Sequence, residues 1–460
     1  ANKYYDKVPS IVEVTMEQVF QLTGRRYKLF DYVGAPDAER VIVMMGGGSP
    51  VVEEAVKYLM QTQNAKIGLI KVRLYRPWAS DRFLAALPST AKRIAVLDRT
   101  KESGAHGEPL YLDICTTLME AGEGARLVVG GRFGLGSKEF TPAMAVSVFD
   151  NLALEKPKNH FTVGIIDDVT HTSLQLLPNI TTVPTGTTQC LFWGMGSDGT
   201  VGANKDAVKI IADNTPLFAQ AYFAYDAHKS GGVTISHLRF GPEPIYSQYL
   251  IYEADYVAVH HESYIFKYDF LSTLKPGGVL VLNATWPLDR LEEKIPASVK
   301  RRIAKLQPKL YYINARAISN SVGLGKRINM VLQTVFFYLS GVLPFEKAIG
   351  LLKKAIEKTY GKKEPIIVTM NKQCVDEAIK HLVQVPIPSS WADVPVTNIK
   401  KNIPGASDFV NTVIQPILAL EGDSLPVSAF IAGGTMPPGT TQFEKRAIAT
   451  KIPVWKEDAC

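Results

Sequence analysis

Short apolar runs, each followed by a glycine-rich or polar turn and then by a stretch with helical spacing, recur along the chain from about residue 40. The first series of runs covers residues 41–45, 67–72, 94–97 and 127–129. These runs are nearly all apolar instead of alternating, which is typical of parallel strands covered on both faces of the sheet. The pattern predicts a first α/β domain that ends near residue 185.

A second series of the same kind starts with the apolar residues 190–193, a glycine-rich turn at 194–205 and a helical stretch. Apolar residues at i, i+3, i+4 and i+7 between 328 and 339 predict a helix packed in the core instead of a row of ligand contacts. The fold class is therefore α/β, with two consecutive open, mostly parallel-sheet domains. The remaining strands of the second domain are predicted at 218–224, 233–238, 256–260, 279–282 and 310–313.

Proline becomes frequent after Pro386 and interrupts the βαβ pattern. Only one helix, at 406–420, is predicted in this part of the chain. Such a segment is expected to lie as a Pro-rich arm across other domains, because it has too little regular structure to build a core of its own. The later prolines stand at positions 404, 416, 426, 437, 438 and 453.

Composition and charge exclude several classes of protein. Of the 460 residues, 46% are hydrophobic and 21% are charged, so the chain is globular and not disordered. The net charge of +7 comes from mixed-sign residues without a basic block, which argues against nucleic acid as a partner. The longest apolar stretch, 331–345, is interrupted and too short for a bilayer span, so no membrane partner is expected. Four cysteines without paired spacing indicate a reducing compartment.

The strongest chemical signal is the turn after Trp193. Gly194, Gly196 and Gly199 form a GxGxxG pattern between a predicted strand and a predicted helix, the context in which this motif binds a nucleotide phosphate. Backbone amides and the dipole at the helix start would favour the negative charge. The next strand ends near Asp226, which suggests the ribose of NAD, and Lys229 suits an additional phosphate. A tight turn without a ligand is the alternative.

Other catalytic patterns are missing. Met195 stands where a GxSxG nucleophile turn needs glycine. No histidine lies at a distance along the chain from Ser197 that indicates a catalytic pair. His260 and His261 are adjacent, so they leave a strand on opposite faces, and no HExxH motif or cysteine pair accompanies them. A zinc site is therefore not predicted, and no catalytic acid or base can be named. The glycines of 46–50 lack the GxGxxG spacing and are interpreted as a structural turn.

Six segments in order resemble the pyruvate:ferredoxin (flavodoxin) oxidoreductase family, whose members are thiamine-dependent, iron–sulfur, CoA-acylating enzymes. The resemblance runs along nearly all of the chain and implies that it is a central portion of such an enzyme. The six segments are RVIVMMGGGSP (40–50), IGLIKVRLYRPW (67–78), RIAVLDRTKESGAHGEPLY (93–111), GMGSDGTVGANK (194–205), HKSGGVTISHLRFGPEP (228–244) and GTMPPGTTQFEKR (434–446).

The resemblance also implies a domain plan. Residues 1–28 would be the tail of a missing pyrimidine-side thiamine domain, and 29–185 a transketolase-C-terminal-like domain. Residues 186–396 would be a Rossmann-like CoA-binding domain, and 397–437 a linking arm. Residues 438–460 would start a ferredoxin-like domain that is truncated here.

The family's ligand contacts can be carried over to matching positions. The turn at 197–201 would hold the phosphates of coenzyme A, in agreement with the interpretation of its glycines. Lys229 would add a positive charge for a phosphate, and Asn329 and Asn371 would supply amide donors and acceptors. Cys460 would be the first ligand of a 4Fe-4S cluster whose other ligands lie beyond the chain. The residues implied in the turn are Ser197, Asp198, Gly199, Thr200 and Val201.

The resemblance implies an enzyme that decarboxylates pyruvate oxidatively to acetyl-CoA and CO2. Thiamine diphosphate, magnesium and 4Fe-4S clusters would serve the intact enzyme, mainly outside this segment, and ferredoxin or flavodoxin would accept the electrons. The segment alone should be inactive, and the intact enzyme is expected to be a homodimer in the cytoplasm or, alternatively, in a hydrogenosome or mitochondrion-related organelle. Two other functions stay open: an NAD-dependent dehydrogenase that uses the same turn, and a non-catalytic scaffold that docks catalytic neighbours.

Overall fold

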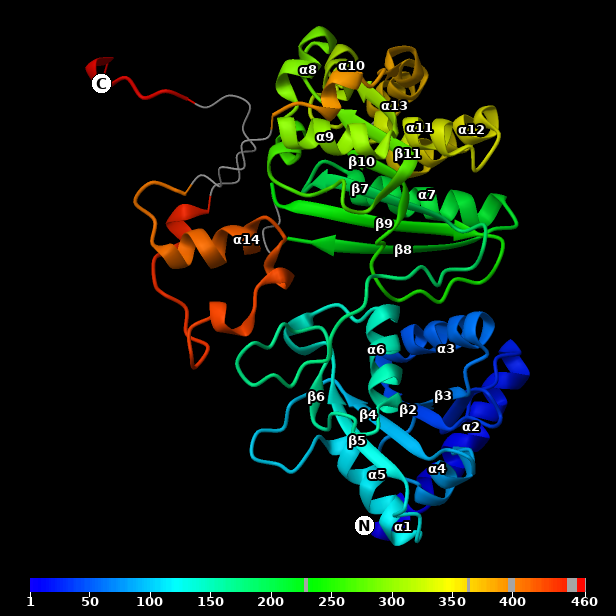
Figure 1. Ribbon diagram of the computed structural model, residues 1–460. Coiled ribbons are helices and arrows are strands. Elements are labelled where there is room, and N and C mark those ends of the chain that lie inside the picture. Colours follow the sequence, from blue (N-terminus) through cyan, green and yellow to red (C-terminus); the bar gives the residue numbers. More distant parts are fainter. Residues whose placement is uncertain (227–230, 362–364, 396–401, 445–452, 460) are drawn as a thin grey trace. The chain divides into compact units, whose positions relative to one another are not determined.

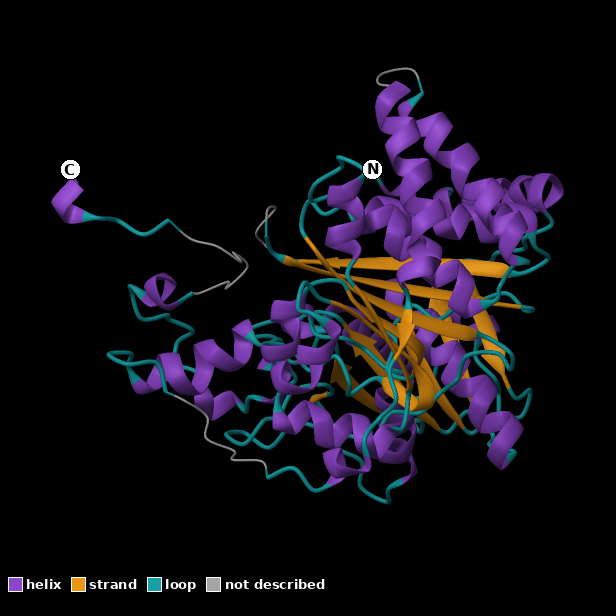
Figure 2. Ribbon diagram, turned by 90° about the horizontal axis from the view of Figure 1, so that it is seen from above, coloured by secondary structure: helices purple, strands orange, loops and turns teal. Residues whose placement is uncertain are grey.

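The computed structural model describes residues 1–226, 231–361, 365–395, 402–444 and 453–459. The chain separates into two compact units (Figure 1). The first contains Ala1–Val183 together with Tyr246–Tyr249 and Asp423–Met436. The second contains Pro184–Ile245, Leu250–Gly422 and Pro437–Cys460. In Figure 2 the strands, in orange, are flanked by helices, in purple, as expected for an α/β protein.

The first unit is built on a six-stranded sheet with the order β1-β3-β2-β4-β5-β6. All neighbouring strands are parallel except β1, which runs antiparallel to β3. The four apolar runs predicted for this domain are confirmed as β2 to β5, whereas β1 was not predicted because its half-buried sequence FDYVG lacks a continuous apolar run. The strands are β1 (Phe30–Gly34), β2 (Arg40–Met45), β3 (Ile67–Val72), β4 (Arg93–Asp98), β5 (Leu127–Arg132) and β6 (Phe161–Thr162).

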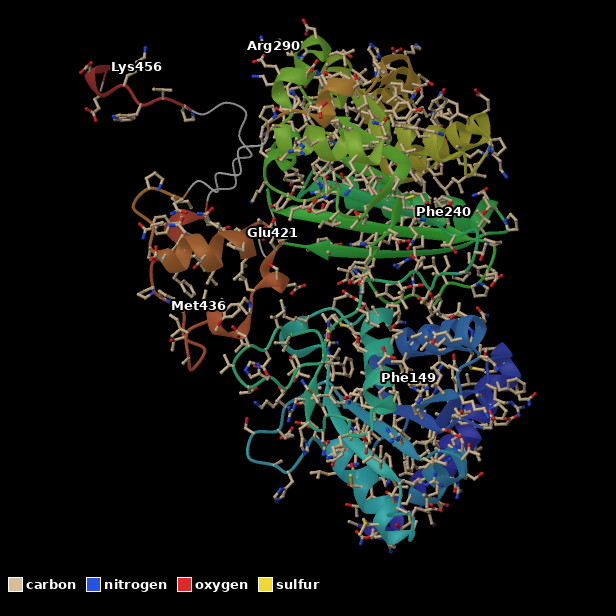
Figure 3. All side chains as sticks on the ribbon, viewed as in Figure 1. Phe149, Phe240, Arg290, Glu421, Met436 and Lys456 are labelled. Atoms are coloured by element: carbon tan, nitrogen blue, oxygen red, sulfur yellow. The ribbon has the colours of Figure 1, made fainter. Side chains whose placement is uncertain are left out.

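Helices cover both faces of this sheet. The helices α3 and α6 contact each other on one face, and α4 and α5 lie on the other (Figure 1). Phe149 of α6, labelled in Figure 3, is 1% exposed and belongs to the core. By contrast, none of the residues of α1 or α2 is buried. The helices are α1 (Asn2–Tyr5), α2 (Val8–Thr23), α3 (Ser49–Gln63), α4 (Ser80–Ala86), α5 (Pro109–Glu120) and α6 (Pro142–Ala153).

Asp98, at the end of β4, makes the stability of the first unit depend on pH. Its carboxylate accepts hydrogen bonds from the amides of Leu110 and Tyr111 at the start of α5, each at 3.2 Å. Burial nevertheless raises the pKa of Asp98 from 3.8 to about 6. The folded state therefore holds a proton that the unfolded chain has already released between these pH values. Stability must fall as pH rises through this window.

We expect the protein to lose on the order of 1–3 kcal/mol of unfolding free energy between pH 4 and pH 7 through this group. Asp98→Asn should remove this pH dependence, because its side chain is uncharged at either pH, while its single oxygen can accept only one of the two amide hydrogen bonds. Urea unfolding of both proteins at pH 4.5 and pH 7 measures the difference. Parallel pH dependences of parent and variant would show that Asp98 does not carry the effect.

The second unit is built on a seven-stranded sheet with the order β13-β12-β11-β10-β7-β9-β8. Strands β7, β10, β11 and β12 are mutually parallel. The sheet contains more antiparallel pairing than the sequence predicted, because β8 and β9 form a hairpin and β9, not β8, pairs with β7. The strands are β7 (Thr188–Met195), β8 (Phe218–Tyr225), β9 (Val233–Gly241), β10 (Ala254–Val259), β11 (Leu274–Asn283), β12 (Lys309–Ile313) and β13 (Val383–Gln384).

Two helical layers enclose this second sheet. One face is covered by α7, α11, α12 and α13, and α9 packs on β11 at the other face. The prediction that the helix at 328–339 belongs to the core is confirmed, since Val331, Val335 and Phe337 are fully buried in α11. Phe240, labelled in Figure 3, is buried in the same core. The helices are α7 (Thr200–Asn214), α8 (Leu291–Lys294), α9 (Ala297–Leu306), α10 (Ala315–Ser321), α11 (Asn329–Ser340), α12 (Phe345–Tyr360) and α13 (Pro365–Ala378).

The proline-rich arm is described over 402–444. The helix predicted at 406–420 is shorter, with a π-helical turn at Val410–Ile414 that continues into α14 (Gln415–Leu418). The segment Asp423–Met436 belongs to the first unit, where the amide of Val427 donates to the carbonyl of Ile166. In the part of the chain that the structure describes, no helix combines the length and apolar character needed to cross a bilayer.

Candidate functional site

The predicted glycine turn joins the end of β7 to the start of α7 in the second unit. Two of its glycines are required by the local geometry. A Cβ atom at Gly194 would lie 2.8 Å from the side chain of Thr200, and Gly199 has φ +90°, which other residues rarely adopt. Ser197 also has a positive φ, 74°, although it is not glycine. Residues held in such conformations are concentrated at ligand sites.

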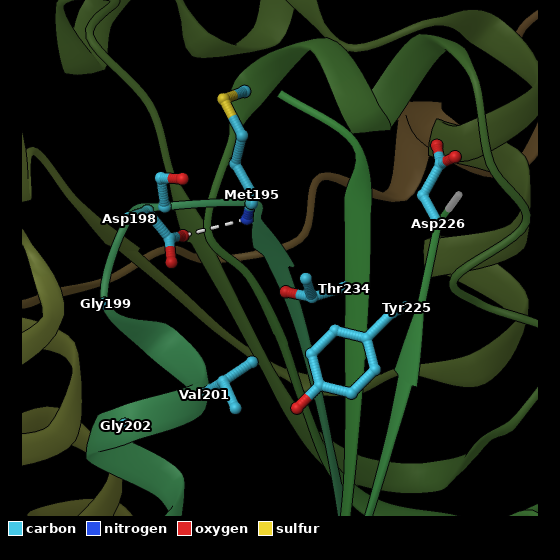
Figure 4. A pocket seen from close by; sticks show the side chains of 10 residues that line it. Met195, Asp198, Gly199, Val201, Gly202, Tyr225, Asp226 and Thr234 are labelled. Atoms are coloured by element: carbon cyan, nitrogen blue, oxygen red, sulfur yellow. Dashed lines mark hydrogen bonds between the residues drawn. The ribbon is translucent and has the colours of Figure 1, made fainter. Parts of the chain in front are cut away.

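The carboxylate of Asp198 holds this turn together. It accepts hydrogen bonds from the amide of Met195 at 2.8 Å (Figure 4), from the amide of Thr200 at 2.7 Å, and from the Thr200 hydroxyl at 2.8 Å. The Thr200 hydroxyl lies 2.9 Å from Nδ1 of His260. Burial lowers the pKa of His260 to about 4, so its ring is neutral at pH 7. The Asp198 side chain therefore shapes the turn and has no donor to offer a ligand.

Some backbone amides of the turn donate hydrogen bonds within the protein, and others do not. The amide of Gly196 donates to the carbonyl of Gly232 at 2.7 Å, and that of Asp198 donates to the carbonyl of Met195 at 3.0 Å. The amides without an acceptor among the described residues are those of Ser197, Gly199, Val201 and Gly202. Val201 and Gly202 lie in the first turn of α7, Gly199 is its N-cap, and Ser197 precedes it by three residues. The helix dipole is positive at this end, which favours an anion.

A cavity of about 440 Å³ lies beside these amides (Figure 4). Tyr225 and Asp226, at the end of β8, line it together with Thr234 of β9. Thr234 is 6% exposed, and its hydroxyl has no hydrogen-bond partner in the described part of the chain. The cavity thus combines backbone donors with an acidic residue, and a buried hydroxyl that lacks a partner lies in its wall.

A second cavity, of about 160 Å³, lies between α7 and the helices α11 and α12. Gly199 and Gly202 line both cavities, so the first turn of α7 separates them. Asn329, the first residue of α11, is 8% exposed and lines the smaller cavity. A Cβ atom at Gly199 would lie 2.9 Å from Cγ of Asn329, so the two residues are in close contact.

The structure brings most of the expected site residues together. Ser197, Asp198, Gly199 and Val201 line the larger cavity, while Thr200 is buried beneath the turn. Asn371 lines neither cavity. It lies in α13 and donates to the carbonyl of Ile367 in its own helix at 2.8 Å. Two further residues, Lys229 and Cys460, lie outside the described residues.

Two residues of the site were missed by sequence reasoning. Thr234 reaches the cavity because β9 pairs with β7, which places Thr234 opposite Gly194. The residues around the glycine motif carry no sequence pattern that predicts this pairing. Gly202 falls outside the GxGxxG spacing, although a glycine inside a helix is itself a signal of a special role. Among the described residues, no group of three His, Cys, Asp or Glu side chains is arranged to bind a metal ion.

Family models match the chain in three places. The model described as pyruvate ferredoxin/flavodoxin oxidoreductase matches residues 189–381, which include both cavities. The model of pyruvate:ferredoxin oxidoreductase core domain II matches residues 38–143 of the first unit. A third model, of a domain of unknown function, matches residues 397–449.

Two known proteins resemble the chain over its whole length, and one solved structure aligns with part of it. It is 54% identical to a pyruvate:ferredoxin oxidoreductase of Moorella thermoacetica, which it matches over all of this chain and 39% of that protein. It is 49% identical to the mitochondrial pyruvate dehydrogenase [NADP(+)] of Euglena gracilis, over all of this chain and 26% of that protein. The pyruvate oxidoreductase subunit PORC of Thermotoga maritima aligns with 43% of this chain and 98% of its own, at 16% identity and a TM-score of 0.35.

The chain thus spans about two fifths or less of the length of these two relatives. Two models of one family match its two α/β units, and the sequence similarity leaves no part of the chain uncovered. The protein therefore belongs to the pyruvate:ferredoxin (flavodoxin) oxidoreductase family, of which it forms a central portion.

Proposed function

We propose that the second unit binds coenzyme A for an enzyme that oxidatively decarboxylates pyruvate to acetyl-CoA and CO2, with ferredoxin or flavodoxin as electron acceptor. The observation that carries this proposal is the group of four unpaired amides at the start of α7, beside a cavity of about 440 Å³. Backbone donors at a helix N-terminus bind phosphate, and coenzyme A carries its phosphates at the nucleotide end.

The chain's own contribution would be to hold and orient this substrate. The turn supplies donors fixed by the Asp198 hydrogen bonds, and Asp226 lines the cavity where a ribose hydroxyl could donate to it. Lys229 would neutralise an additional phosphate, and Asn329 would contact the ligand from the smaller cavity. A contact from Asn371 stays a prediction, since its amide group donates within its own helix.

Chemistry on pyruvate would depend on groups held elsewhere. Among the described residues we find no arrangement that fits a metal ion or an iron–sulfur cluster. Thiamine diphosphate, magnesium and 4Fe-4S clusters would supply decarboxylation and electron transfer in the neighbouring domains of the intact enzyme, which we expect to be a homodimer. Binding the thiol substrate in a defined place lowers the entropic cost of its reaction with an acetyl group held by those domains.

The strand order of the second sheet argues against the alternative of an NAD-dependent dehydrogenase. In a dinucleotide-binding fold, the acidic residue that binds the ribose ends the parallel strand next to the glycine turn. Here β9 lies between β7 and β8, so Asp226 stands one strand further away and its strand is part of a hairpin. The NAD-dependent dehydrogenase is therefore the weaker candidate.

The three described cysteines are free, which fits a reducing compartment. We place the protein in the cytoplasm. A mitochondrion-related organelle is the alternative, because the Euglena gracilis relative is mitochondrial.

Calorimetric titration of the full chain tests the proposal. We expect coenzyme A to bind, and dephospho-CoA to bind about 10- to 100-fold more weakly, because it lacks a phosphate that Lys229 would contact. Lys229→Met should weaken coenzyme A binding to the level of dephospho-CoA and leave dephospho-CoA binding unchanged. Equal affinities for the two ligands would remove the assigned role of Lys229.

Two outcomes would overturn the proposal as a whole. Binding of NADH without binding of coenzyme A would favour the dehydrogenase. The absence of any nucleotide binding, with no change in melting temperature on addition of coenzyme A, would favour the non-catalytic scaffold.

A further inference from the structure

His260 is a buried titratable residue to which the proposed binding of coenzyme A assigns no role. It directly follows β10 and is 4% exposed. Its amide donates to the carbonyl of Trp193 in β7 at 2.9 Å, and its carbonyl accepts from Nδ2 of Asn283 in β11 at 2.7 Å. Its ring packs edge-on against Phe192, with the two ring centroids 6.2 Å apart. The strands on either side of β10 therefore fix both the backbone and the ring of His260.

The ring of His260 contacts the glycine turn through one hydroxyl. Its Nδ1 atom lies 2.9 Å from the hydroxyl oxygen of Thr200, and the same oxygen lies 2.8 Å from Oδ2 of Asp198. A hydroxyl has a single proton to donate, and a carboxylate only accepts. The Thr200 proton is therefore donated to Asp198, so the hydroxyl oxygen must accept a hydrogen bond from Nδ1 of His260.

This order of donors fixes the tautomer of His260. The ring is neutral at pH 7 because burial lowers its pKa, so only one of its two nitrogens carries a proton. When Nδ1 carries that proton, Nε2 is an acceptor only. Nε2 is buried and has no hydrogen-bond partner among the described residues. Buried N–H groups without an acceptor are rarer than buried acceptors without a donor, so the surroundings of Nε2 agree with a proton on Nδ1.

We propose that His260, as the Nδ1–H tautomer, is a positioning residue for the glycine turn and acts on Asp198 through Thr200. This inference rests on the proposed binding of coenzyme A, although His260 itself lines neither cavity. The bond from Nδ1 holds the Thr200 hydroxyl toward Asp198, whose carboxylate also accepts from the amides of Met195 and Thr200. With these two amides engaged, the turn keeps the conformation in which four other amides have no acceptor among the described residues.

Nuclear magnetic resonance of the full chain with isotopically labelled histidine reads the tautomer, because protonated and bare ring nitrogens differ strongly in chemical shift. We expect His260 to carry its proton on Nδ1 at pH 7. The signals of His260 are those that disappear in His260→Asn. His237 is an internal reference: it is also buried, and its Nδ1 accepts from the amide of Ile251 at 3.1 Å, so its proton must lie on Nε2. A proton on Nε2 of His260 would overturn the proposal, because Thr200 would then donate to His260 and not to Asp198.

Two variants separate positioning from packing. In asparagine, Nδ2 is as many bonds from Cα as Nδ1 is in histidine, so His260→Asn can still donate to Thr200, whereas His260→Leu cannot. In calorimetric titrations of the full chain, we expect His260→Leu to bind coenzyme A about 5- to 10-fold more weakly than the parent, and His260→Asn to recover most of that loss. Thermal melts should rank the two variants in the opposite order, because a buried leucine has no polar group to satisfy. A side chain needed only for packing would favour leucine in both measurements.

If His260→Leu binds coenzyme A as tightly as the parent does, the positioning role is overturned and the proposed function stays intact. If coenzyme A does not bind to the parent, the proposed function fails, and the positioning role fails with it. The resonance spectra use the unmodified chain. The absence from them of any stable Nδ1–H tautomer would therefore overturn the proposal even if neither variant folds.

Discussion

Gly199→Val is expected to weaken coenzyme A binding more than about 100-fold. Valine at φ +90° is strained by about 1–2 kcal/mol, and its Cβ would lie 2.9 Å from Cγ of Asn329. To relieve the contact, either the Asn329 side chain or the turn with its unpaired amides must shift, and both are parts of the proposed site. The added side chain also stands where both cavities meet. Calorimetric titration and a thermal melt of the same preparation measure binding and stability separately.

A matched control is Gly277→Val in β11. Gly277 has φ +72°, a Cβ atom at this position would meet nothing within 4 Å, and the residue lines neither cavity. This variant should lose stability through similar backbone strain and keep its affinity for coenzyme A. If Gly199→Val binds coenzyme A as tightly as the parent does, the ligand does not use this turn.

Arg132→Met is expected to destabilise the first unit by about 3–5 kcal/mol, because it leaves a buried charge without its partner. Glu108 is 1% exposed, and its Oε1 atom accepts from Nε of Arg132 at 2.6 Å. The other carboxylate oxygen has no partner among the described residues. Hydrogen exchange of amides in α5, which begins next to Glu108, would report the loss of stability locally.

The double variant Arg132→Met with Glu108→Gln distinguishes the charge from the packing. Removing both charges should restore most of the lost stability, because the glutamine is uncharged and its burial costs less. Arg132 also donates to the carbonyl of His160 at 2.9 Å, and neither variant keeps that bond. A double variant as unstable as Arg132→Met would assign the loss to this bond and to packing.

Much of the fold could be predicted from local pattern. Continuous apolar runs predicted β2, β3, β4 and β5 and the parallel strands of the second sheet, because buried parallel strands need apolar residues on both faces. The edge strand β1 was missed, since an edge strand is only partly buried and its sequence carries a weaker pattern. The position of β9 between β7 and β8 was missed as well, because strand order follows from long-range pairing.

The sequence by itself determined the two α/β series, the glycine-rich turn at Gly194–Gly199 and the family, because each of these depends on segments whose residues lie close together along the chain. Only the tertiary structure decided how the turn is used. In the folded chain, the Asp198 carboxylate accepts hydrogen bonds within the turn, and four backbone amides have no acceptor among the described residues. Thr234 lines the larger cavity and Gln333 the smaller one. Those relations join residues from different strands and helices, and they arise from packing, which no local pattern encodes.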